Sequence, residues 1–80
     1  MDGSSSLIGS IGILTVPTRG AQGPGEVVIR IRGGSEAFIA WSAESLPKGA
    51  SVVVVNDRGT RAVDVSAWND PFRPLPDDVV

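Results

Sequence analysis

The chain of 80 residues alternates between apolar runs and short stretches rich in glycine, proline and polar residues. Residues 26–32 show the clearest alternation. Val27, Ile29 and Ile31 fall on one face of an extended strand, and the polar members of the run fall on the other. The 3.6-residue period of an amphipathic helix never persists for long. The pattern therefore predicts five strands, at residues 8–16, 26–32, 36–43, 51–56 and 60–68.

The segments between these runs have the composition of turns and loops. Residues 18–25 are rich in glycine and are predicted to form a loop. A Gly-Gly pair at residues 33–34 indicates a tight hairpin, and Asp-Arg-Gly at residues 57–59 indicates another turn. Residues 44–49 interrupt the chain between the third and fourth strands, with room for at most one short helical turn.

A set of five short strands tends to close on itself, because a closed barrel removes exposed strand edges and encloses a single core. We therefore predict an all-β fold, a small five-stranded antiparallel barrel of the OB type, over residues 7–68. An SH3-like barrel is the main structural alternative. Residues 1–6 are expected to form a flexible linker, or simply a frayed terminus, and residues 69–80 a proline-rich acidic tail.

The amino-acid composition limits the kinds of catalytic and binding site that the chain can form. The chain contains no cysteine and no histidine, which removes thiol nucleophiles, imidazole bases and most transition-metal ligand sets. The formal net charge of −2 argues against a general nucleic-acid binder, because that affinity comes mostly from Lys and Arg neutralising phosphates. No apolar stretch approaches the 18 or more residues needed to cross a bilayer, so the chain itself is expected to be soluble.

Several short motifs follow one another in the order that is typical of the NfeD family. They are Leu7-Ile8-Gly9 with Gly12, then Gly25-Glu26-Val27-Val28-Ile29, then Phe38-x-Ala40-x-Ser42, and finally Leu46-Pro47-Lys48-Gly49 followed by Val52-x-Val54-Val55 and Gly59. Each motif occurs in many β domains, but the ordered set covers residues 7–65. The chain therefore resembles the soluble C-terminal domain of the NfeD family of membrane proteins. One departure is Phe38, where family members usually carry tryptophan.

This resemblance implies a fold and a role. The family fold is a five-stranded OB barrel, and the domain is the cytoplasmic part of a short membrane protein associated with stomatin- or flotillin-like scaffolds or with the regulation of membrane proteases. The family's transmembrane helices precede this domain and are absent from these residues, so membrane attachment is implied by resemblance alone. A non-catalytic protein-interaction module without a cofactor is the function that the resemblance favours.

Arg30, Arg32 and Trp41 are the candidate contact residues. The two arginines lie on the polar face of the second strand, and Trp41 falls opposite in parity to Phe38. If Phe38 is in the core, Trp41 is at least partly exposed and could anchor a protein partner, or the tail could fold back over it. The alternative function is a single-stranded nucleic-acid-binding OB domain, in which the arginines contact phosphates and aromatic rings stack on bases.

Enzyme chemistry finds little support in the sequence. A nucleophilic serine needs a general base, and without histidine the sole lysine, Lys48, would have to serve. Its place beside Gly49 is typical of an exposed turn instead. The aspartates lack the spacing of a calcium loop, and the glycines of residues 20–25 open no helix that could hold a phosphate. No catalytic, cofactor or metal site is therefore predicted.

Overall fold

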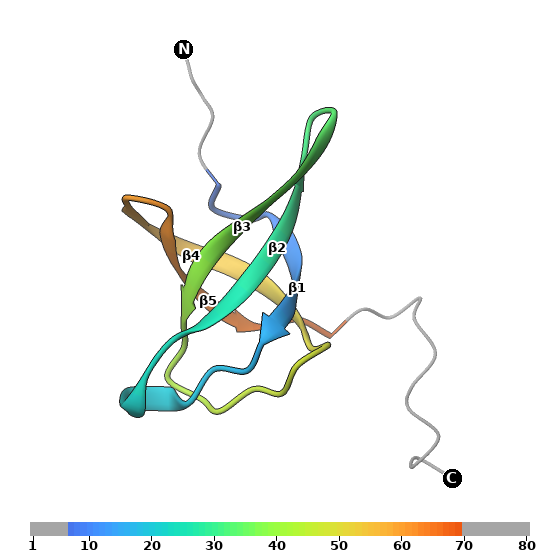
Figure 1. Ribbon diagram of the computed structural model, residues 1–80. Coiled ribbons are helices and arrows are strands. Elements are labelled where there is room, and N and C mark those ends of the chain that lie inside the picture. Colours follow the sequence, from blue (N-terminus) through green and yellow to red (C-terminus); the bar gives the residue numbers. More distant parts are fainter. Residues whose placement is uncertain (1–6, 70–80) are drawn as a thin grey trace, which may run out of the picture.

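Alternating apolar side chains build a ring of strands in the computed structural model, which describes residues 7–69 (Figure 1). The strands are β1 (Ile11–Val16), β2 (Gly25–Ile31), β3 (Gly34–Trp41), β4 (Ser51–Gly59) and β5 (Ala62–Ala67), and η1 (Gly20–Gln22) is a turn of 3-10 helix between β1 and β2. The predicted linker at residues 1–6 and nearly all of the predicted tail lie outside the described residues.

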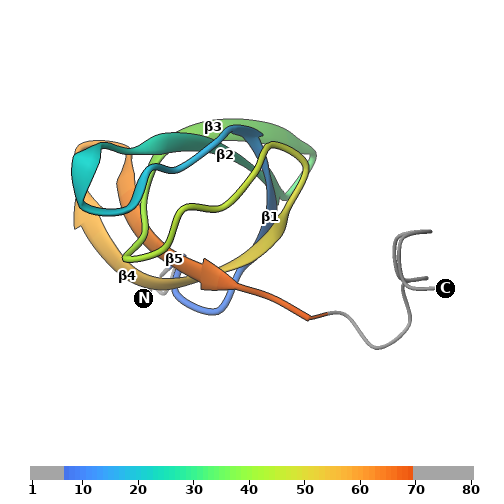
Figure 2. The same cartoon turned by 90° about the horizontal axis from the view of Figure 1, so that it is seen from below.

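The strands close into a barrel in the order β1-β2-β3-β5-β4, with β4 returning to β1. All neighbours pair antiparallel except β3 and β5, which pair parallel. Seen from below, the strands surround an enclosed interior (Figure 2). This arrangement is the five-stranded Greek-key barrel of the OB fold, and it confirms the predicted fold class. The one parallel pair is a detail that the prediction of an antiparallel barrel missed.

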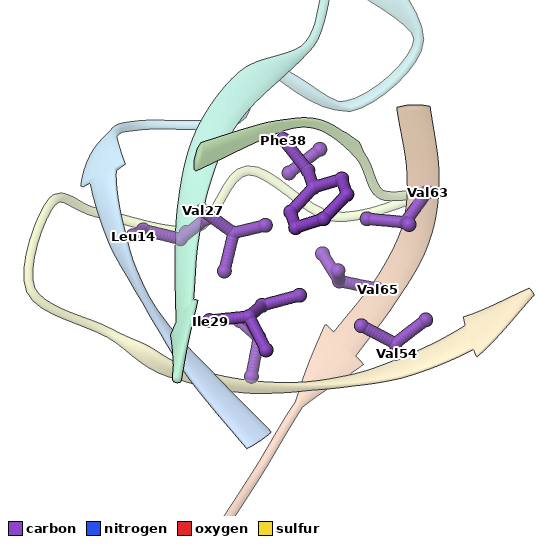
Figure 3. Close-up of a cluster of buried hydrophobic side chains, with 9 residues drawn as sticks. Leu14, Val27, Ile29, Phe38, Val54, Val63 and Val65 are labelled. Carbon is purple, nitrogen blue, oxygen red and sulfur yellow. The ribbon is translucent and has the colours of Figure 1, made fainter. Parts of the chain in front are cut away.

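The barrel interior is filled by residues from all five strands. Phe38 lies among valines of β4 and β5, so the condition on which the predicted exposure of Trp41 depended is met (Figure 3). Val27 and Ile29 point inward from β2, in agreement with the alternation of that strand. The buried cluster comprises Leu14, Val27, Ile29, Phe38, Ala40, Val52, Val54, Val63 and Val65. Burial of these side chains is the main source of stability for a domain of this size.

Two connections differ from the prediction. The residues at 57–59 do not turn the chain, because β4 continues to Gly59, which pairs with Ala62. The turn is formed by Thr60 and Arg61, both at positive φ (52° and 61°). Positive φ at both central residues is typical of a type I′ hairpin turn, which follows the right-handed twist of the strands. Residues without a glycine signal thus make this turn.

The second difference concerns the β2–β3 hairpin. Ile31 pairs with Gly34, so the turn is made by Arg32 and Gly33, one residue earlier than the predicted Gly-Gly pair. Gly33 adopts a φ of +80°, which a glycine accepts without strain. Residues 44–49 form a loop without a helical turn, which the prediction allowed, and a turn of 3-10 helix lies within the predicted loop between β1 and β2.

Candidate protein-contact surfaces

Trp41 lies at the end of β3 and points to the outside of the barrel, as its parity relative to Phe38 predicts. Its indole is half-buried because Arg58 covers it, with the guanidinium carbon Cζ 4.9 Å from the ring centroid. The Nε of Arg58 donates a hydrogen bond of 2.8 Å to Oδ1 of Asp64. Asn56 donates from Nδ2 to the other oxygen of the same carboxylate at 3.1 Å. The four side chains form one connected cluster, hereafter the Trp41 cluster.

Strand pairing and β-bulges bring this cluster together. Trp41 and Asp64 are partners in the parallel β3–β5 pair. The register of β4 against β5 shifts twice, between Val54 and Asn56 and again between Asp57 and Gly59. Each shift leaves an extra residue in β4, and Arg58 is one of them. A bulge re-aims the side chain of its strand, and here it places the Arg58 guanidinium over Trp41.

An open groove runs beside the Trp41 cluster and has a volume of about 640 Å³. Trp41 and the chain that follows β3 form one wall, and residues of β4 and β5 form the other. Gly20 and Ala21 of η1 also line it. The lining combines apolar side chains with Arg58, Asp64 and Glu44, a mixture that suits peptide or side-chain recognition.

The two predicted arginines lie elsewhere. Arg30 is exposed on β2 and pairs with Ser35, and Arg32 stands in the hairpin turn itself, not on the face of the strand. Ser35 and Trp41 are separated by six residues of β3, or about 20 Å of extended strand. The structure therefore places the arginines at one end of the β2–β3 hairpin and Trp41 at the other. Whether any of the three contacts a partner stays a prediction.

A third surface, which sequence reasoning missed, lies on the outside of β1, β4 and the end of β5. Ile11 and Ile13 point outward from β1 and are 41% and 40% exposed. Ile11 pairs with Val53 and Ile13 with Ser51 of β4, and the backbone N–H of Trp68 donates to Ser51. We call Ile11, Ile13, Val53 and Trp68 the β1–β4 face. The missed signal is that β1 is apolar on both of its faces, where a half-buried strand alternates.

Other predicted features are placed as follows. Lys48 is exposed in a turn beside Gly49, whose φ is +90°. Within residues 7–69 the acidic side chains form no group of three that could hold a metal ion. No helix in this part of the chain is long and apolar enough to span a membrane. The proposed cover of Trp41 by the C-terminal tail falls outside the described residues.

Comparison with known proteins identifies the family. The model of the NfeD C-terminal domain matches residues 11–66, which include all five strands of the barrel except the last residue of β5. The chain belongs to the NfeD family. The NfeD barrel is also similar to the solution structure of the soluble domain of the NfeD protein YuaF from Bacillus subtilis, with a TM-score of 0.63 and 26% sequence identity. That similarity covers 84% of this chain and 75% of the other. No functionally curated protein matches this NfeD sequence.

Proposed function

We propose that this NfeD domain is a non-catalytic protein-interaction module of a membrane protein, and that its partner is a scaffold of the stomatin or flotillin type. The β1–β4 face is the observation that carries the proposal. Trp68 is 42% exposed there, across β4 from the outward isoleucines of β1. Contiguous apolar surface of this kind marks protein contacts in soluble domains, and tryptophan is enriched among the residues that dominate binding.

The backbone of this face favours recognition through side chains. β1 pairs with β2 on one side and with β4 on the other, so its hydrogen-bonding groups are engaged in the sheet. A partner therefore contacts a preformed surface of apolar side chains with Ser51 and Ser66 between them. Such a surface loses little conformational entropy on binding, because the barrel already fixes it.

The resemblance to the family supplies the choice of partner and the location. Stomatin- and flotillin-like scaffolds are the associated proteins that the family suggests, and regulation of a membrane protease is the alternative outcome of the same contact. We place the domain on the cytoplasmic face of the membrane in its parent protein on the same ground. The choice of partner is tested by binding, not by the fold.

Isothermal titration of the purified chain against a purified stomatin-type scaffold tests the proposal. Ile13→Arg places a charge at the centre of the β1–β4 face and is expected to weaken binding at least tenfold. Ile39→Arg is the matched control, because Ile39 has a similar exposure of 46% and lies on β3, which pairs with neither β1 nor β4 in the barrel. Equal affinities for the two variants, or no binding by the wild type, would contradict the proposal.

A further inference from the structure

Strand β5 has a partner on both sides for only part of its length. It pairs with β3 through Ala62, Val63 and Asp64, where β3 ends at Trp41. It continues to pair with β4 as far as Ala67. In the described part of the chain, residues 65–67 therefore have a neighbouring strand on the β4 side alone. The other side of this short stretch is a strand edge, and an edge can accept another strand.

The backbone bonds of β4 show which groups of β5 face that edge. Val54 directs both its N–H and its C=O away from β5, to Ser10 and Gly9. Its partner Val65 therefore belongs to a pair that exchanges no hydrogen bonds within the β4–β5 ladder. Because such pairs alternate with bonded ones, Ala67 has the same orientation as Val65. The C=O of Val65 and the N–H of Ala67 consequently point toward the groove beside the Trp41 cluster.

The groove is held open at this point by contacts on its other wall. After Trp41 the chain leaves β5, and the hydroxyl of Thr18 donates to the carbonyl oxygen of Glu44 at 2.7 Å. The same hydroxyl oxygen accepts from the N–H of Leu46 at 2.9 Å. Thr18 is only 2% exposed, so these bonds are partly shielded from water and tie the segment to the β1–β2 connection. The segment cannot close onto β5.

We propose that an extended peptide segment of a partner protein adds to the edge of β5 at residues 65–67. The unpaired backbone groups select an extended strand, because strand addition satisfies donor and acceptor together. The side chain that the peptide turns outward lies beside Trp41 and Val55 in the groove and is apolar. Glu44 lines the same groove and forms no ion pair with a described residue, so a basic side chain flanks the apolar one. This site is separate from the β1–β4 face.

Selection of linear octapeptides displayed on phage against the folded chain supplies the probe, and synthetic copies of the selected peptides are then titrated. Ala67→Pro removes the edge N–H and is expected to weaken binding at least tenfold, because proline is tolerated at a strand edge whose N–H faces outward. Ala67→Ser keeps the N–H and is the matched control, with affinity close to that of the wild type. Ile13→Arg, which disrupts the β1–β4 face, is expected to leave peptide binding unchanged.

Amide hydrogen exchange on the wild-type complex gives a readout that does not depend on any variant. The Ala67 amide is expected to exchange at least tenfold more slowly when peptide is bound. This measurement uses the wild-type chain, so it tests the proposal even if Ala67→Pro does not fold. Selected peptides that bind without protecting this amide would overturn the proposal, and so would a selection that yields no binding peptide. Failure of scaffold binding with intact peptide binding would overturn the proposed function alone.

Discussion

Arg58 and Trp41 are stacked on the outer surface of the barrel, although 17 positions separate them in the sequence. The stack joins the bulged part of β4 to the end of β3 across β5, and Asp64 of β5 holds the guanidinium from the side. Trp41 is thus neither part of the barrel core nor a freely exposed ring. A partner that binds at Trp41 therefore contacts the indole and the guanidinium of Arg58 together.

Arg58→Ala is expected to lower the free energy of unfolding by about 0.5–1 kcal/mol, since cation–π pairs and ion pairs at exposed sites are weak. The side chain of Arg58 is close to half exposed, which keeps the loss small. Urea unfolding measures it. Arg32→Ala is the control, because Arg32 stands exposed in a hairpin turn, and it should change stability by less than about 0.5 kcal/mol. A loss of unfolding free energy as large as that caused by truncating a core side chain would contradict this prediction, because it would show that Arg58 contributes to stability like a buried residue.

Thr18→Val is expected to cost about 1–3 kcal/mol, because the partly buried C=O of Glu44 and N–H of Leu46 lose their partner while the volume is conserved. Thermal or urea unfolding checks this. Thr15→Val is the matched control, since Thr15 is exposed and bonds to Glu26 at the surface. Similar losses for the two variants would mean that the Thr18 bonds do not anchor the segment after β3.

The barrel could be predicted because its strands follow simple periods. Val27 and Ile29 of β2 point inward and alternate with the outward Glu26, Val28 and Arg30. Such a pattern depends only on neighbours along the chain. It therefore shows that Phe38 and Trp41 point to opposite sides of their strand, because that relation follows from parity alone. Which of the two faces the core is decided by the barrel.

The surfaces could not be predicted in the same way, because they depend on pairing between distant strands. The register shifts of β4 place Arg58 over Trp41, and the local sequence contains no pattern that predicts a bulge. The turn at Thr60 and Arg61 carries no glycine, so the Asp-Arg-Gly run before it gives the stronger turn signal in the sequence. The sequence places Arg30 and Trp41 on neighbouring strands, but the hairpin register separates them to opposite ends of these strands.

Gly12→Ala is expected to destabilise the barrel by about 3 kcal/mol, at the upper end of the usual cost of overpacking. A Cβ at this position would lie 2.6 Å from Cγ2 of Val27 and 2.7 Å from the backbone oxygen of Val28, and the oxygen cannot move away without disturbing the sheet. Chemical denaturation measures the change. Gly34→Ala is the control, since a Cβ there meets nothing within 4 Å. A neutral Gly12→Ala would show that β1 and β2 are less closely packed than in the structure.

Oligonucleotide binding offers a last prediction, on the function most often associated with OB barrels. Base stacking needs an exposed aromatic ring near the cationic groups. Phe38 is instead enclosed in the core, and Trp41 is covered by Arg58 and lies at the far end of the hairpin from Arg30. Fluorescence titration with single-stranded oligothymidine at about 50 mM salt, where phosphate contacts are strong, is therefore expected to show no saturable binding. Saturable binding that weakens with salt and is lost in the Arg30→Ala, Arg32→Ala double variant would instead establish the hairpin as a nucleic-acid site.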